Sequence, residues 1–180
     1  SPTATAETNV NSNVNANSAN SNVAGGKKDE PVPTFTDAAT AFAEGNKYFD
    51  ANQTEKAIEA FKQAVKMNPD LAEAHFKLGI ALALVEREKE EAAELNPANQ
   101  TQPTPTPAKT VKKGKNVVVM TESDRAFENA VKAYKKIVAK NPKDDLAHFN
   151  LGRSYNKIND DKEAEKSLRQ AVKLKPDDTE

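Results

Sequence analysis

The sequence predicts an all-α protein, a solenoid of three helical hairpins. An extended tail is expected before the first hairpin, and a long insertion is expected to interrupt the second hairpin. A pattern of small and bulky residues recurs with a period of 34 residues, a length typical of stacked two-helix units. The first copy is Gly45, Ala57, Phe61, Ala64 and Pro69, and the last copy is Gly152, Ala164, Leu168, Ala171 and Pro176. The spacings from the glycine are identical in these two copies, which indicates repeats of one structural unit.

The tail, residues 1–34, is rich in Asn, Ser, Thr, Ala and Val. Such a composition is typical of a flexible linker. However, Asn occupies every second place from Asn9 to Asn17, with Val10 and Val14 among the residues between. A period of two is the strand period, and Asn rows form ladders when strands stack. The tail is therefore either a linker or an assembly strand.

Residues 35–71 form the first repeat, with helices expected at about 37–49 and 54–67 and Thr54 as the N-cap of the second. Gly45 falls inside the first helix, where Gly costs about 1 kcal/mol relative to Ala. A close approach of the second helix would offset that cost. The small residue that would face the glycine is Ala57, and Phe61 would fill the space one turn further on. In the second repeat, Ala130 and Tyr134 are expected to make the same two contacts, and in the third repeat Ala164 and Leu168 are expected to do so.

The second repeat, residues 72–142, carries 39 extra residues between Gly79 and Ala130 when compared with the first. Its first helix should continue to Leu95, and its second should begin near 124 after a cap at Thr121 or Ser123. Two lengthened helices predict a projecting two-helix stalk. The core of the insertion, about 96–121, contains a Pro-rich spacer followed by a β-prone run. That run consists of Val117, Val118, Val119 and Met120.

Residues 143–180 form the third repeat and the C-terminus. The chain resembles the tetratricopeptide repeat family, most clearly in AHFKLG at 74–79 and AHFNLG at 147–152, and in the Asn-Pro pairs at 68–69 and 141–142. Some features depart from the family: its usual Trp is replaced by Ala or His, and no capping helix follows Pro176. Val172 and Leu174 are therefore expected on an exposed solenoid end.

The resemblance implies a concave groove that binds peptides, lined by the first helix of each repeat. By register, the lining residues are Phe42, Asn46, Phe49, Phe76, Lys77, Ile80, Phe149, Asn150, Arg153 and Lys157. The carboxylate clamp of some relatives is not expected, because only Asn46 matches it. The Phe residues either bury an apolar partner segment or belong partly to the core, as aromatics at this place commonly do.

Composition narrows the function classes. A net charge of −1 argues against nucleic acid or an anionic membrane as the main partner, and no apolar run is long enough for a membrane span. Without Cys there is no thiol nucleophile or thiolate metal site. His75 and His148 occupy equivalent places without a shared ligand set, so core packing is favoured over metal binding. We find no enzyme motif and expect no catalytic, cofactor or metal site.

Two functions remain. The first is a structural protein that assembles with copies of itself, as a homo-oligomer or a filament, through the solenoid ends, the tail and the Val-rich run. The second is a monomeric adaptor that binds a partner peptide in the groove of an envelope complex, with the tail as a tether. The Asn/Ser-rich tail and the lack of Cys suggest a secreted or cell-surface location in a bacterium, outside the cytoplasm.

Overall fold

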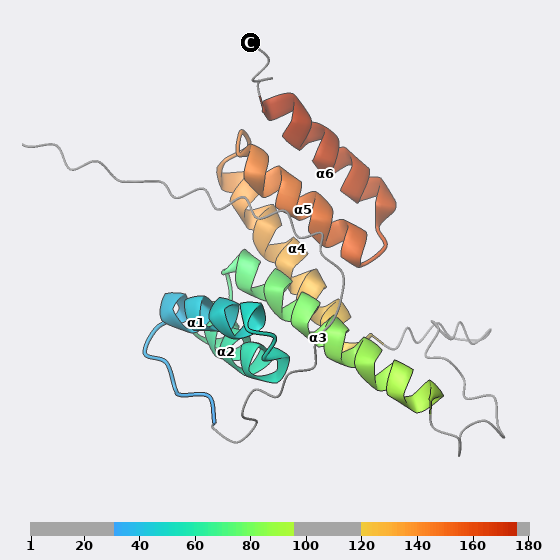
Figure 1. Cartoon of the computed structure of the whole chain (residues 1–180). Helices are drawn as coiled ribbons and strands as arrows, with labels where there is room; N and C mark the ends of the chain where they lie inside the picture. Colours follow the sequence, from blue (N-terminus) through green and yellow to red (C-terminus); the bar gives the residue numbers. More distant parts are fainter. Residues whose placement is uncertain (1–30, 96–119, 176–180) are drawn as a thin grey trace, which may run out of the picture.

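The described part of the chain, residues 31–95 and 120–175 of a computed structural model, contains six α-helices and no strand. They are α1 (Ala38–Asp50), α2 (Thr54–Met67), α3 (Ala72–Glu94), α4 (Glu122–Lys140), α5 (Asp145–Lys157) and α6 (Asp161–Leu174). Consecutive helices pair into three hairpins, and the second helix of each hairpin packs on the first helix of the next. The hairpins succeed one another from α1 and α2 at the lower left to α5 and α6 at the top (Figure 1). The predicted all-α class is confirmed.

Polar side chains cap the starts of four of the helices in these residues. Asp37, Thr121, Asp144 and Asp160 each accept a hydrogen bond from the backbone N–H three residues further on. A cap of this kind contributes typically about 1 kcal/mol to helix stability. Of the two caps considered for α4, the structure uses Thr121, and Asp124 completes a capping box.

The prediction that Thr54 caps α2 was wrong. Thr54 is the first helical residue, and the N-cap is Gln53, which makes no side-chain capping bond. The reason lies in the turn, where Asn52 adopts a left-handed φ of 57°. Asn159 does the same in the third hairpin, with a φ of 58°. Asn tolerates this conformation better than most residues, so it closes both turns tightly.

Each hairpin has a glycine where its helices come closest. A Cβ on Gly45 would lie 2.5 Å from the ring of Phe61, and a Cβ on Gly152 would lie 2.7 Å from Leu168. In both hairpins the bulky residue follows the glycine by 16 positions, as predicted.

The middle hairpin departs from this register. The ring that meets Gly79 belongs to Phe127, 2.6 Å from where a Cβ would be, and not to Tyr134 as predicted. Tyr134 lies instead in a core cluster with Leu151 and Tyr155 of α5. Phe127 follows Gly79 by 48 positions, so the insertion adds 32 residues between the packing positions rather than the expected 39. The seven-residue difference is about two helical turns.

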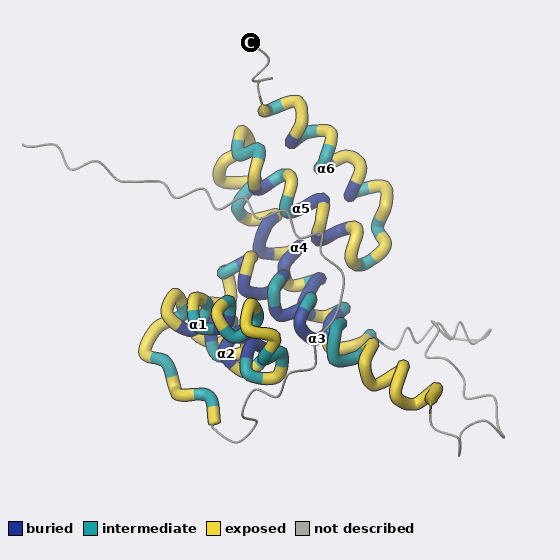
Figure 2. The backbone as a smooth tube through the Cα atoms, in the orientation of Figure 1, coloured by how far each residue is buried: buried dark blue, intermediate teal, exposed yellow. Residues whose placement is uncertain are grey.

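The lengthened helices form only part of the expected stalk. α3 has 23 residues and α4 has 19, against 13 or 14 in the others. However, α4 begins beside Glu86, whose carboxylate accepts hydrogen bonds from the Ser123 hydroxyl (2.6 Å) and backbone N–H (3.2 Å). Beyond Glu86, α3 is exposed on all sides and projects without α4 (Figures 1 and 2).

The core runs through all three hairpins. One cluster joins α2, α3 and α4, and a second joins α3 to α6. Before α1, the extended chain is held to α2 by the Gln63 side chain. Its Oε1 accepts from the N–H of Phe35 and its Nε2 donates to the carbonyl of Pro33, both at 3.1 Å. This segment packs Phe35 against a small cluster formed by one alanine each from α1, α2 and α3.

Candidate functional site

The predicted groove residues lie on α1, α3 and α5, the first helices of the three hairpins. Two cations connect these helices. The Lys77 ammonium on α3 lies 5.7 Å from the ring centre of Phe49 on α1. The Arg153 guanidinium on α5 lies 4.7 Å from the ring centre of Phe76 on α3 and 5.7 Å from that of Phe149. The fold thus makes three cation–aromatic contacts among five of the predicted residues, and two of them, Lys77 with Phe49 and Arg153 with Phe76, bridge successive hairpins.

The three rings differ in how far a partner could reach them. Phe76 is only 5% exposed, with its ring edge-on to Phe127 and its outer face under Arg153. Phe49 is half-buried, whereas Phe149 is 44% exposed. Phe76 is therefore the floor of this surface, and Phe149 is the ring that a partner can touch directly.

The other two apolar members of the set belong mainly to the core. Phe42 is half-buried, with its ring centre 5.8 Å from that of Phe61. Ile80 is partly buried against the cluster that joins α3 to α6. Both side chains are thus only partly accessible, and the expectation that such aromatics are partly buried fits Phe42.

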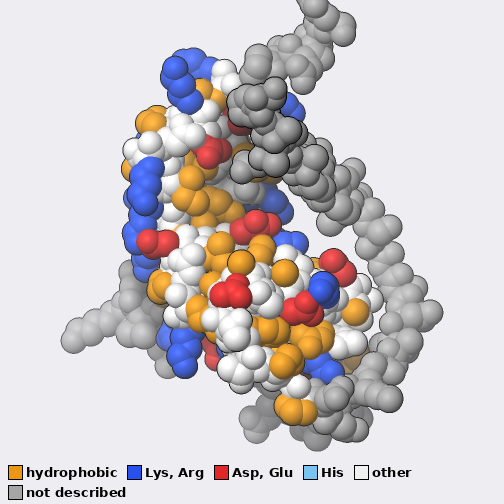
Figure 3. All heavy atoms as spheres, turned by 90° about the vertical axis from the view of Figure 1, so that its left-hand side faces the viewer, with side chains coloured by type: hydrophobic (Ala, Val, Ile, Leu, Met, Phe, Trp, Pro, Cys, Tyr) orange, Lys and Arg blue, Asp and Glu red, His pale blue; other side chains and the backbone are white. Residues whose placement is uncertain are grey.

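The polar members supply hydrogen-bonding groups. Asn150 Oδ1 accepts a hydrogen bond from Arg153 at 3.4 Å, which helps to hold the guanidinium in place. Asn46 has a buried Oδ1 without a hydrogen-bond partner among the described residues. Lys157 is exposed in the last turn of α5. In the space-filling view, which shows one face of the molecule, hydrophobic side chains are interspersed with charged ones (Figure 3).

Both histidines are engaged in equivalent structural bonds. His75 Nε2 lies 2.9 Å from the carbonyl oxygen of Pro69, and His148 Nε2 lies 3.0 Å from that of Pro142. His75 is buried, and this burial lowers its pKa below the ordinary value of 6.5, against the raising effect of the Pro69 bond. Within residues 31–95 and 120–175, no three His, Asp or Glu side chains are grouped closely enough to hold a metal ion.

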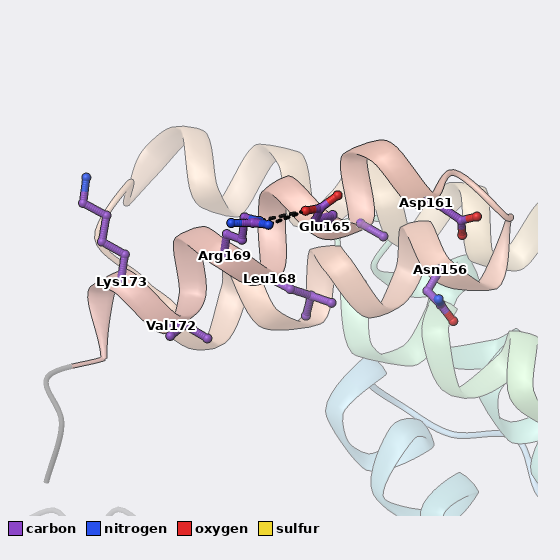
Figure 4. A pocket seen from close by; sticks show the side chains of 8 residues that line it. Asn156, Asp161, Glu165, Leu168, Arg169, Val172 and Lys173 are labelled. Atoms are coloured by element: carbon purple, nitrogen blue, oxygen red, sulfur yellow. Dashed lines mark hydrogen bonds and ion pairs between the residues drawn. The ribbon is translucent and has the colours of Figure 1, made fainter. Parts of the chain in front are cut away.

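The predicted solenoid end is an open hollow of about 670 Å³ on α6 (Figure 4). Its lining residues are Asn156, Asp161, Ala164, Glu165, Leu168, Arg169, Val172 and Lys173. Val172 is 74% exposed there, whereas Leu174 is half-buried and does not line the hollow. The sequence reasoning missed Leu168 as a surface residue because it assigned this side chain wholly to the contact with Gly152.

The opposite end of the solenoid is polar. α3 packs on α2 with Leu78, Ala81 and Leu82, and the positions 34 residues earlier on α1 hold Glu44, Lys47 and Tyr48. Glu44 and Lys47 form an ion pair there, and the Lys56 ammonium lies over the Tyr48 ring. The outer face of α1 therefore has the character of a capping repeat, which is polar on its outer side.

The predicted assembly strands fall almost entirely outside the described residues. Val10, Val14, Val117, Val118 and Val119 all lie there. Met120 is described: it is half-buried, belongs to no helix and directly precedes the cap of α4. A search of the described helices for a long apolar stretch of membrane-spanning character found none.

Two family models match the sequence. One, described as a TPR repeat, matches residues 45–85, and the other, described as a tetratricopeptide repeat, matches residues 123–180. Together they cover more than half of the 180 residues. The sequence matches no curated protein.

The fold is similar to several solved structures. The first TPR of Spaghetti (RPAP3) bound to an HSP90 peptide is 16% identical, with a TM-score of 0.43 over 82% of this chain and 86% of that one. The CopN-Scc3 complex is 19% identical, with a TM-score of 0.41 over 79% and 61%. A mutant of MamA is 16% identical, with a TM-score of 0.41 over 77% and 73%. The family assignment depends on the two sequence models.

Proposed function

Because this chain belongs to the tetratricopeptide repeat family, we propose that it is a non-catalytic scaffold whose α1–α3–α5 face binds a segment of a partner protein. The observation that carries the proposal is the pair of cation–aromatic contacts, in which Lys77 and Arg153 are held over rings and bridge successive hairpins. Such fixed cations are good donors to carboxylates, because little side-chain entropy is lost when they bind.

The surface favours an extended, acidic partner segment with at least one apolar side chain. Arg153 and Lys77 offer donors for carboxylates, and the exposed Phe149 ring offers an apolar contact beside them. The side-chain amide of Asn150 stands on the same helix as Arg153 and Phe149 and suits the polar groups of an extended backbone. An aromatic ring next to an arginine is also the kind of pair that dominates binding energy at interfaces.

The test is selection of peptides from a displayed random library on the immobilised full chain. We expect the selected peptides to be rich in Asp and Glu, with an apolar anchor. Phe149→Ala and Arg153→Ala should each weaken binding of a selected peptide by about tenfold or more. Leu146→Ala is the control, because Leu146 is another exposed apolar residue on the same helix, and this variant should bind normally.

Phe76→Ala is not a suitable probe, since Phe76 is a core residue whose loss would destabilise the fold. Peptides without acidic enrichment, or binding that survives both Phe149→Ala and Arg153→Ala, would rule out this face as the binding site. Circular dichroism of each variant shows whether helicity is retained.

The second candidate is self-assembly into a structural, extracellular polymer through the solenoid ends, tail and insertion. The open hollow beside Val172 on α6 favours a contact between copies at that end of the solenoid. Removal of residues 1–34 should then reduce the fibres seen by negative-stain electron microscopy, and fibres unchanged by that truncation would exclude the tail from assembly. A bacterial cell-surface or secreted location goes with either candidate and is tested by fractionation of the producing cells.

A further inference from the structure

The outer face of α6 has an apolar strip that no described residue covers. Figure 4 shows Leu168 and Val172 on the same side of the helix, at the hollow, and Val172 is 74% exposed. The equivalent faces of α2 and α4 pack against α3 and α5. Among the described residues, the strip on α6 is thus a helix-packing surface that no helix covers.

The charged residues beside the strip are ordered along α6. Asp161 and Glu165 lie in its first half, and Arg169 and Lys173 lie in its second half. Glu165 and Arg169 already form an ion pair within the helix at 2.7 Å, so a second copy would add its own charges to this pair (Figure 4). If two such helices packed in parallel, like charges would face each other. If they packed antiparallel, the acidic half of each would face the basic half of the other, so the surface is complementary to itself.

The apolar residues fit the same antiparallel arrangement. When Glu165 faces Arg169 of a second copy and Asp161 faces Lys173, the helices cross next to Leu168. Val172 of each copy then faces the first two turns of the other helix. There Ala164 is small enough to leave room for a branched side chain.

We propose that this face binds a second copy of the chain, with α6 packed antiparallel on α6 about a two-fold axis. Such an interface is closed, because each copy uses the same surface and none is left for a third.

The contact is small. α6 has 14 residues, so it is about 21 Å long, and one helix pair buries less than a standard-size interface. The dimer should therefore dissociate on the order of micromolar concentrations. The peptide-binding face lies on α1, α3 and α5, so the dimer and the proposed peptide binding succeed or fail separately.

The first experiment is sedimentation equilibrium of the full chain from about 1 to 100 µM. We expect a reversible monomer–dimer equilibrium, which Val172→Glu should weaken at least tenfold without loss of helicity. Leu146→Glu is the control, because it places the same charge on another exposed apolar site and should leave the dimer intact. A monomer at all concentrations, an open series of larger oligomers, or a dimer that resists Val172→Glu would overturn the proposal.

Charge reversal tests the antiparallel geometry itself. Arg169→Glu with Lys173→Glu should abolish the dimer, and so should Asp161→Lys with Glu165→Lys. All four substitutions in one chain should restore the dimer, because an antiparallel pair then regains opposite charges at each contact. Failure of the fourfold variant to dimerise, while its thermal melt shows a folded chain, would refute the antiparallel packing.

Discussion

The middle hairpin and the two outer hairpins all press a bulky side chain onto a glycine, but they take that side chain from different turns of the second helix. Phe61 and Leu168 follow their glycines at the same spacing, whereas the middle hairpin uses Phe127 in place of the aligned Tyr134. Phe127 and Tyr134 are seven residues apart and so lie on one face of α4. The insertion has therefore changed the register of the helices while preserving the kind of contact between them.

The shift has a further consequence for the next hairpin. Because Phe127 occupies the place at Gly79, Tyr134 is available to pack with Leu151 and Tyr155 of α5. Burial there raises the pKa of the Tyr134 hydroxyl, and the charge of Glu73 adds to the effect. An insertion in a loop of one hairpin thus alters the contact between that hairpin and its neighbour.

The largest expected effect comes from removing the ring at the shifted position. Phe127→Ala should lower the free energy of unfolding by about 3–5 kcal/mol, because it empties a buried site against Gly79. In the sequence alignment, Phe127 corresponds to Thr54 of the first hairpin, which is only half-buried. Thr54→Ala should therefore lower the free energy of unfolding by no more than about 0.5 kcal/mol. Urea unfolding followed by circular dichroism measures both. Similar losses in the two variants would contradict the shifted register.

A smaller effect is expected when the glycine itself is changed. Gly79→Ala improves helix propensity, but its Cβ would lie 2.6 Å from the Phe127 ring, so a net loss of about 1–3 kcal/mol is expected. Adding Phe127→Leu should recover most of that loss, whereas adding Tyr134→Leu should not. Equal rescue by the two second substitutions would show that the packing partner of Gly79 has been misassigned.

The first hairpin supplies the reference for that experiment. Gly45→Ala should be equally damaging, because its Cβ would lie 2.5 Å from Phe61, and Phe61→Leu should relieve it. A double-mutant cycle gives the coupling energy between Gly45 and Phe61, and a second cycle gives that between Gly79 and Phe127. The two coupling energies should be similar in size. Such agreement would show that one kind of contact is made in two registers.

The sequence predicted the helices well because they depend on local signals. The repeated small and bulky residues, the Asn-Pro helix ends and the capping side chains all act within a few residues. The cap of α2 was mispredicted because the left-handed turn at Asn52 determines where the helix starts. The residues Gln53 and Thr54 do not reveal this turn. The long α3 was predictable, since Glu86 replaces the turn-forming Asn52 of the first repeat.

The register of α4 is not local, and the alignment alone misassigned it. One signal was present: the place of the second small residue, Ala64 in the first repeat, fell to Ile137. In the observed register, Ala130 corresponds to Ala64 and Ser123 corresponds to Ala57. Both places in the middle hairpin therefore hold a small, buried residue. The predicted groove residues lie on the first helices of the three hairpins, as their register implied. Neither the burial of Phe76 nor the stacking of Arg153 follows from spacing, because both depend on how the hairpins pack.

The smallest expected effect concerns a bond that the middle and third hairpins share. His75 and His148 make the same contact to a proline carbonyl, but His75 is buried and His148 only half-buried. Because burial lowers the pKa of His75 in the folded protein, the unfolded chain takes up a proton first on acidification. The stability that His75 contributes is thus full above its unfolded pKa and is lost as the pH falls toward its folded pKa.

His75→Gln removes this titration while keeping a side-chain N–H that can donate to the Pro69 carbonyl. The free energy of unfolding of the unchanged protein should fall between about pH 7.5 and about pH 5, and that of His75→Gln should fall less. The slope of the free energy of unfolding against pH reports the uptake of the proton. A loss of packing in His75→Gln would lower this free energy equally at all pH values and would leave the slope unchanged. The charge of Asp70 opposes the shift, so Asp70→Asn should steepen the decline. Parallel pH curves for His75→Gln and the unchanged protein would mean that His75 takes up its proton equally well in the folded core.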